Sequence, residues 1–231
     1  MKFKLMPEQV SLKDVLSFTV YKQAKRTDRI FGFIRRSFHT VEVVIDNELE
    51  EIFRNFNSTT KNEIRKVDKK FDAIHQPVED IEEYIGFYNN FAGNIGLKKV
   101  HHDTLVPYKE NLCITKAMVN NSNITMHAYL ADDNNRIVRL LTSSRAFDAI
   151  GVSRNEIAYI NRWHHWEDIK YFKNKKYDIY DFGGYAKDSG DKKLDQINKF
   201  KTGFSKNIVE ESNYYSIPSY LLCKLLKRKV E

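Results

Sequence analysis

The sequence has few cysteines, prolines and glycines, and it has no long hydrophobic run. Its two cysteines, Cys113 and Cys223, are too few for a disulfide framework and indicate a reducing compartment. A run of about 18 uncharged apolar residues, which a membrane-spanning helix requires, does not occur. Residues 1–8 also lack the apolar core of a secretory signal peptide. From these absences we expect a cytoplasmic protein with no membrane-spanning segment.

Several motifs that carry known reactions are missing as well. The chain contains no glycine-rich dinucleotide or Walker loop, no Cys-x-x-Cys pair and no Gly-x-Ser-x-Gly elbow. Nucleotide hydrolysis, zinc ribbons and serine-hydrolase chemistry are therefore disfavoured. His164 and Glu167 would share one face of a helix, but a two-metal site needs a second such pair and further carboxylates on facing helices. The His/Asp cluster at residues 101–103 has no supporting motif either, so we expect no metal.

What the chain does contain is enough apolar side chain for a core and an excess of positive charge. Hydrophobic residues make up 42% of the 231 positions, which excludes global disorder. Lysine and arginine number 38 against 31 aspartates and glutamates, which gives a net charge of +7. This excess points to an anionic partner, namely a nucleic acid, a phosphorylated ligand or a membrane surface. A solvated lysine-rich face explains it equally well.

Hydrophobic periodicity predicts a mixed α+β protein. Strands are expected at 17–21 and 40–45, joined by a basic loop at 22–36, and later runs separated by polar turns predict an antiparallel meander. The three meander strands cover 112–119, 124–130 and 136–142, and two further strands are expected at 177–181 and 207–211, with a turn at Gly183-Gly184. Helices are expected at 49–56, 58–70, 78–88, 156–173 and 191–201, with a closing helix from Pro218.

No linker rich in glycine, proline or serine interrupts this pattern. We therefore predict one domain over residues 1–231 around a mixed central sheet flanked by helices. Its N-terminal strands and helices occupy 1–110, and the meander with a strand-helix-strand unit occupies 111–231.

Two short glycine-containing motifs occur in the C-terminal part. Asp181-Phe182-Gly183-Gly184 ends a predicted strand, and Phe200-Lys201-x-Gly203-Phe204 ends a predicted helix. An ordinary exit from strand to loop also explains the first motif. In this order and spacing the two motifs resemble the C-terminal signature of the Fem-type aminoacyltransferases, which share the GNAT-type N-acyltransferase fold. The basic segment 58–66 is similar to that family's basic helix, so the resemblance covers residues 40–211.

The resemblance implies a GNAT-like single domain that acts as an N-acyltransferase. Its acceptor would be an amine of a sugar or of a cell-envelope or polysaccharide precursor. Acyl-CoA is the expected donor and co-substrate, and the alternative is a peptidoglycan-type aminoacyltransferase that uses aminoacyl-tRNA. A chain of this length has room for little more than one GNAT-type unit, whereas peptidoglycan-bridge members carry two. The segment 151–156 also lacks the glycine-rich pyrophosphate loop of acyl-CoA enzymes.

Three residues are candidates for the chemistry. Lys201 is expected near the reacting acyl group as a fixed cation or a proton carrier, although the helix dipole alone also favours a lysine at a helix C-terminus. Asp181 is a candidate base or amine-orienting group, or else a turn-forming residue. His165 is a second candidate base because imidazole titrates near neutrality, or else a histidine packed beside Trp166 in the core.

Other residues are candidates for binding. Arg145, Arg154 and Arg162 surround the start of the long helix, where they suit either phosphate contacts or solvation and ion pairing at the surface. The predicted substrate-binding residues are Arg145, Trp166, Tyr180, Gly183, Gly184 and Phe200, and the predicted cofactor-binding residues are Arg154, Asn155 and Arg162.

A binding module without catalysis is the rival interpretation. In that case the basic helix at 58–70 and the basic loop at 22–36 hold nucleic acid or membrane phosphates. The closing helix carries leucines at 221, 222, 225 and 226, so it would rest on an anionic membrane surface or, more commonly, pack on the sheet. The expected partners are thus a small-molecule or glycan-precursor substrate, with aminoacyl-tRNA and peripheral contact at the inner membrane face as further options.

Overall fold

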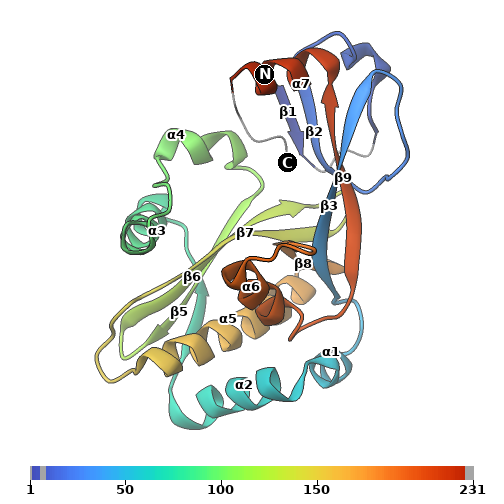
Figure 1. Ribbon diagram of the computed structural model, residues 1–231. Helices are drawn as coiled ribbons and strands as arrows, with labels where there is room; N and C mark the ends of the chain where they lie inside the picture. The colour runs from blue at the N-terminus through green and yellow to red at the C-terminus, as the bar shows by residue number, and fades with distance from the viewer. Residues whose placement is uncertain (1, 6–8, 227–231) are drawn as a thin grey trace. The chain divides into compact units, whose positions relative to one another are not determined.

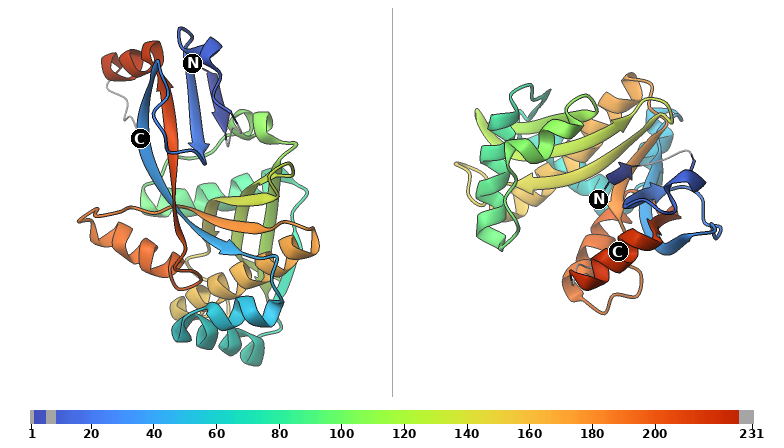
Figure 2. Two further views of the ribbon diagram at one scale, coloured as in Figure 1. Left: turned by 90° about the vertical axis from the view of Figure 1, so that its right-hand side faces the viewer. Right: turned by 90° about the horizontal axis from the view of Figure 1, so that it is seen from above.

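The computed structural model describes residues 2–5 and 9–226 (Figures 1 and 2). The chain forms two compact units. Unit 1 comprises Met1–Val41, Gly184–Asn198 and Asn207–Glu231, and unit 2 comprises Glu42–Gly183 and Lys199–Lys206. The single domain over 1–231 stays a prediction.

The elements alternate between strands and helices along the chain. The strands are β1 (Lys2–Leu5), β2 (Thr19–Ala24), β3 (Phe33–Val44), β4 (Ile74–Pro77), β5 (Leu112–Val119), β6 (Ser122–Asp132), β7 (Ile137–Arg145), β8 (Ile179–Gly184) and β9 (Ile208–Ser216). The helices are α1 (Leu49–Asn55), α2 (Ser58–Lys70), α3 (Ile81–Ile95), α4 (His102–Leu105), α5 (Arg154–Asn174), α6 (Lys192–Lys201) and α7 (Ile217–Leu225), with 3-10 turns at Leu12–Asp14 and Val106–Tyr108.

The sheet of unit 2 has the strand order β8-β7-β6-β5-β4. Strands β4 to β7 pair antiparallel with their neighbours, which confirms the predicted meander, and β7 pairs parallel with β8. The tight turn between β5 and β6 uses Asn120 and Asn121 with φ of 50° and 58°. Asparagine tolerates this left-handed conformation better than most residues. The polar cluster in the sequence therefore marks the end of β5 correctly.

Helices α3 and α5 pack on opposite faces of this sheet (Figures 1 and 2). Side chains on β6 alternate between the two faces. Met126 and Ala128 pack with Tyr84 of α3, whereas the His127 ring lies 2.9 Å from the amide oxygen of Asn161 on α5. Helix α2 packs along α5. The α5 face of the sheet thus carries polar residues where the α3 face is apolar.

Helix α5 begins with a capping box that the sequence Ser-x-x-Glu encodes. The hydroxyl of Ser153 accepts the Glu156 N–H at 3.4 Å, and the Glu156 carboxylate accepts the Ser153 N–H at 2.8 Å. The indole N–H of Trp163 donates to Asp68 at 2.8 Å, which ties α5 to α2. The buried side of α5 mixes apolar residues with polar ones, namely His164, His165 and Asp168.

Unit 1 has the strand order β1-β2-β9-β3, in which β9 pairs antiparallel with β2 and β3. Strand β2 runs to Ala24 and strand β3 begins at Phe33, so both ends of the predicted loop at 22–36 are wrong. Arg35 lies within the strand, where it pairs with Tyr214 of β9, and its Nε donates to the hydroxyl of Ser212 at 2.7 Å. Strand β9 continues past its predicted end to Ser216, because it still pairs with β2 and β3 there, and its serines are fully buried.

The closing helix α7 has Pro218 in its first turn, as predicted. Cys223 packs into the core of unit 1, whereas Leu221 and Leu225 are exposed. The basic end of this segment, residues 227–229, lies outside the described residues. Among the residues that the structure describes, no helix is both long and apolar enough to cross a bilayer.

Candidate active site

The parallel ladder between β7 and β8 ends where the first glycine motif begins. Its last pair is Arg139 with Asp181, whereas β7 continues along β6. Beyond that pair, the N–H of Gly183 donates to the Asp181 carboxylate at 2.7 Å. Gly183 has a φ of 71°, and a Cβ at this position would lie 3.1 Å from the carbonyl oxygen of Leu140. The glycine is therefore needed at the point where β8 leaves the ladder.

The Asp181 carboxylate is fully buried and held from two sides. Its Oδ2 accepts hydrogen bonds from Nε and Nη2 of Arg139, both at 2.6 Å. Charge-assisted bonds of this paired form fix the orientation of the carboxylate strongly. Alternation along β8 places Asp181 on the opposite face of the sheet from Tyr180. The role of Asp181 as a base or amine-orienting group stays a prediction. In either role its carboxylate would act from this fixed position.

Lys201, the last residue of α6, is a partly buried amine near this carboxylate. Burial lowers the pKa of Lys201 from 10.5 to about 8, and the Asp181 charge offsets only part of that effect. At pH 7 about one tenth of the amine is neutral by this value, so the group can serve as a cation or carry a proton. Both roles predicted for Lys201 are chemically available to it.

The loop after Lys201 is pinned to the start of α2. The carbonyl of Gly203 accepts the Asn57 N–H at 2.9 Å. A Cβ at Gly203 would lie 2.6 Å from the hydroxyl of Thr60 and 3.0 Å from the carbonyl of Phe200. The second glycine motif therefore allows a close approach of two backbones, which holds the end of α6 in place.

His165 is fully buried against β8. Its Nδ1 lies 2.6 Å from the hydroxyl of Tyr180, and its Nε2 is buried without a hydrogen-bond partner among the described residues. Burial lowers the pKa of His165 well below 6.5, and neighbouring positive groups add to the effect, so the ring is neutral. Three phenyl rings lie 4.9, 5.5 and 5.7 Å from the imidazole, those of Phe182, Phe200 and Phe204, and the ring of His127 stacks on it at 4.0 Å.

A second buried carboxylate, Asp168 of α5, links several histidines. Its Oδ1 lies 2.8 Å from Nε2 of His75, and its Oδ2 lies 2.7 Å from Nδ1 of His127. Tyr129 donates its hydroxyl proton to the same Oδ2 at 2.5 Å. Burial alone would raise the pKa of Asp168, but His164 and these hydrogen bonds lower it well below 3.8. Asp168 is therefore a stable buried anion.

Two sets of these side chains have the composition of a metal site. In each set the ligand atoms lie within 4.8 Å of one another, and Asp168 belongs to both. The sets are His75, His164 and Asp168, and His127, His165 and Asp168. The hydroxyls of Thr125 and Thr115 lie 2.7 and 3.1 Å from the two nitrogens of His164. Hydrogen bonds within the protein thus already engage both nitrogens of that ring.

The arginines and the asparagine predicted for phosphate or donor binding lie in two different settings. Arg154 and Asn155 are exposed in the first turn of α5, and Arg145 is exposed at the end of β7. Arg162 is instead engaged internally, since its Nη1 lies 2.9 Å from Glu63 of α2 and its guanidinium lies over a phenyl ring. That ring belongs to Phe200, 4.7 Å away. Trp166 packs at 5.1 and 5.5 Å against Phe53 and Phe56.

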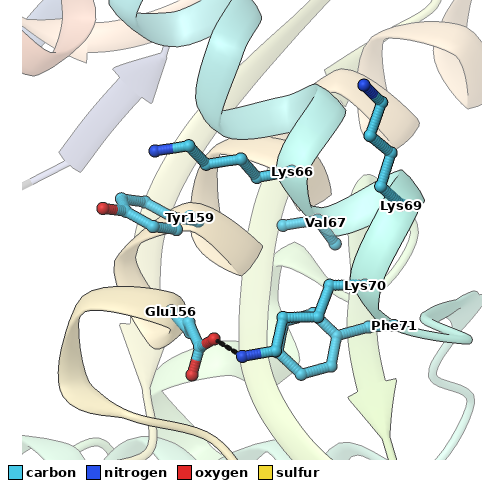
Figure 3. A pocket seen from close by; sticks show the side chains of 7 residues that line it. All are labelled: Lys66, Val67, Lys69, Lys70, Phe71, Glu156 and Tyr159. Atoms are coloured by element: carbon cyan, nitrogen blue, oxygen red, sulfur yellow. Dashed lines mark hydrogen bonds and ion pairs between the residues drawn. The ribbon is translucent and has the colours of Figure 1, made fainter.

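A pocket of about 200 Å³ lies between the end of α2 and the start of α5 (Figure 3). The Lys70 ammonium pairs with the Glu156 carboxylate, and the Lys66 ammonium lies 5.1 Å from the Tyr159 ring. The residues that line the pocket are Lys66, Val67, Lys69, Lys70, Phe71, Glu156 and Tyr159. The basic helix predicted from the sequence therefore lines a pocket beside the start of the long helix.

Sequence reasoning missed several residues of this region. Arg139 and Asp168 were not singled out, because a charged residue in a strand or helix usually faces solvent. The spacing of His164 and Asp168, four apart on one helical face, was an available signal. The alternation of Thr125, His127 and Tyr129 on one face of a strand was another.

The comparisons with known proteins support the fold. No protein-family model matches the sequence, and no curated protein matches it either. The chain has the fold of the Fem-type proteins, as predicted.

Three solved structures illustrate this likeness. FemX has a TM-score of 0.64 and 10% identity, over 94% of this chain and 70% of FemX. L-PGS from Bacillus licheniformis has a TM-score of 0.59 and 10% identity, over 92% of this chain and 74% of that one. The C-terminal domain of an Agrobacterium fabrum protein named as a lysylphosphatidylglycerol synthetase has a TM-score of 0.62 and 8% identity, over 93% and 72% of the two chains.

Proposed function

We propose that the protein is an N-acyltransferase that moves an acyl or aminoacyl group to an amine. The observation that carries this proposal is Lys201, a partly buried amine whose pKa is lowered to about 8. It lies near the fixed pair of Arg139 and Asp181, where β8 leaves β7. Acyl transfer needs positive charge or hydrogen-bond donors for the developing oxyanion and a group that can move a proton. Lys201 is equipped for either task.

The start of helix α5 bears on the choice of acyl donor. Acyl-CoA was the expected donor, and its phosphates would suit the N-terminus of a helix. At the N-terminus of α5 the Glu156 carboxylate accepts the N–H and hydroxyl of Ser153 at 2.8 and 2.7 Å. A negative charge thus already sits where a pyrophosphate would bind. This observation, with the likeness of fold to FemX and L-PGS, favours aminoacyl-tRNA, the alternative donor.

The proposed acceptor is an amine of a sugar or cell-envelope precursor, in a cytoplasmic setting. Peripheral contact with a membrane is a further part of the proposal, supported by the exposed Leu221 and Leu225 on α7. Co-sedimentation with anionic liposomes, for the intact chain and for one with both leucines replaced by serine, checks that part. Equal recovery of both proteins in the supernatant would remove it.

The donor is tested by offering aminoacyl-tRNA and acyl-CoA separately, each with a panel of amino sugars and cell-envelope precursors. Transfer from radiolabelled aminoacyl-tRNA, or release of thiol from acyl-CoA, identifies the donor. Lys201→Met should slow transfer by about 100-fold or more. Lys199→Met, an exposed lysine on the same helix, is the matched control and should stay within about twofold.

The rival binding module gives a different result. It predicts transfer from neither donor, together with tRNA or liposome binding that weakens steeply with salt. That combination would contradict the acyltransferase proposal. Transfer that is unaffected by Lys201→Met would keep the activity and remove Lys201 from it.

A further inference from the structure

A chain of hydrogen bonds connects the buried anion Asp168 to His165, and the direction of each bond follows from the anion. Asp168 can only accept, so Tyr129 donates to it at 2.5 Å. With its one proton used, the Tyr129 oxygen can only accept from Tyr180, whose hydroxyl lies 2.7 Å away. The Tyr180 oxygen in turn accepts from Nδ1 of His165 at 2.6 Å. The proton of the neutral ring is therefore on Nδ1.

The consequence is a bare lone pair on Nε2 of His165. This nitrogen is fully buried and has no hydrogen-bond partner among the described residues. Such atoms are uncommon in native proteins and call for an explanation, because a partner normally offsets the loss of water. The rings of Phe182, Phe200 and Phe204 around His165 supply no acceptor or strong donor of their own. A ligand with an N–H or O–H group is the partner that this atom suits.

We propose that Asp168, Tyr129 and Tyr180 are positioning residues that keep the proton of His165 on Nδ1, so that Nε2 accepts the proton of the acceptor amine. This inference rests on the proposed acyltransferase function. As the bond between the amine nitrogen and the acyl carbon forms, one N–H proton passes to Nε2. Collapse of the adduct then breaks the bond from the acyl carbon to the donor oxygen or sulfur. The leaving group takes the proton from Nε2, and the ring returns to its neutral Nδ1–H form.

The arrangement predicts an effect of a residue that does not touch His165. Without the Tyr129 hydroxyl, the Tyr180 proton loses its acceptor and can turn toward Nδ1 of His165. The preference for Nδ1–H is then lost, and in the share of molecules in which the ring proton moves to Nε2 that nitrogen is blocked as an acceptor. Tyr129→Phe should therefore change the tautomer of His165 at a distance. Tyr180→Phe should remove the preference of the ring proton for Nδ1, because Nδ1–H then has no acceptor.

The first test uses nuclear magnetic resonance and needs no substrate. In protein labelled with nitrogen-15 histidine, long-range proton–nitrogen spectra distinguish the two tautomers, and the loss of one set of signals in His165→Gln assigns His165. Wild type should show Nδ1–H alone, and Tyr129→Phe should show a measurable share of Nε2–H. Tyr84→Phe is the matched control, because Tyr84 is equally buried and bonds to the Thr142 hydroxyl at 2.7 Å; it should leave the tautomer unchanged. An Nε2–H ring in the wild type would overturn the relay.

The second test measures transfer kinetics. Tyr129→Phe and Tyr180→Phe should each lower kcat by about 10- to 100-fold with KM changed less than about threefold, and Tyr84→Phe should change neither. A changed tautomer with undiminished kcat would overturn the role of Nε2 as acceptor. If no donor is used by any variant while the tautomers behave as expected, the proposed function fails and the relay stands.

Discussion

Lys201 supports a prediction about stability that needs no knowledge of the substrate. Folding lowers its pKa from 10.5 to about 8, so the folded protein holds this proton more weakly than the unfolded chain does. At pH 7 both states are mostly protonated, and a difference of about 2.5 pKa units corresponds to about 3 kcal/mol. Lys201→Met keeps the length of the side chain and removes the charge. We expect this change to raise the free energy of unfolding at pH 7 by about 3 kcal/mol.

The gain should depend on pH in a defined direction. As the pH rises through about 8, the folded wild type loses the buried charge, while the unfolded chain keeps it until about 10.5. The wild type therefore becomes more stable in this range, and the advantage of Lys201→Met shrinks to about 1.5 kcal/mol at pH 9.5.

Urea unfolding at pH 7 and pH 9.5 measures both effects. Lys199→Met is the control, since Lys199 is exposed on the same helix, and it should change stability by less than about 0.5 kcal/mol at either pH. A Lys201→Met protein that is less stable than the wild type at pH 7 would refute the reasoning. An equal gain at both pH values would refute it as well.

Two further predictions concern the packing around the site. Burial lowers the pKa values of His164 and His165 well below 6.5, so below that pH the unfolded chain binds two more protons than the folded protein. The free energy of unfolding in urea titrations should therefore fall by about 2 to 3 kcal/mol between pH 7.5 and pH 5.5. The same loss should occur in His102→Gln, which alters an exposed histidine, and a free energy that does not change with pH would contradict this explanation. Gly203→Ala should cost about 1 to 3 kcal/mol in the same assay, because its Cβ would lie 2.6 Å from the Thr60 hydroxyl. Gly93→Ala, where an added Cβ meets nothing within 4 Å, should be neutral or stabilising, and similar losses in both would disprove the steric explanation.

The sequence predicted the parts of the fold in which polarity and burial follow a simple period. The meander was predicted because polar turns separate its runs of β-forming residues, and it pairs as expected. Strand β9 was cut short because Ser212, Asn213 and Ser216 resemble a loop, yet they are buried between two strands. Strand β4, only four residues long and ending in a proline, carried too little pattern to be predicted.

Only the residues of the candidate site that lie in or beside a local sequence motif were predicted. The glycine motifs located Asp181 and Lys201, because glycine marks a backbone constraint that is visible in the sequence. Their partners come from other strands and helices, and the sequence alone does not show which residues a fold brings together. His165 was predicted both as a base and as a core residue, and it lies in the core. Its catalytic role stays a prediction, for which the chain to Asp168 supplies the physical reason.

The burial that makes these groups chemically useful also makes them costly to the fold. Burial among aromatic rings keeps His165 neutral, and burial near Asp181 lowers the pKa of Lys201. A chain selected for stability alone would gain from apolar residues at both positions. Lys201→Met is therefore expected to be more stable and less active than the wild type. A more stable variant with full transfer activity would show that the Lys201 amine has no part in the reaction, and the cost of burying it would then lack a functional explanation.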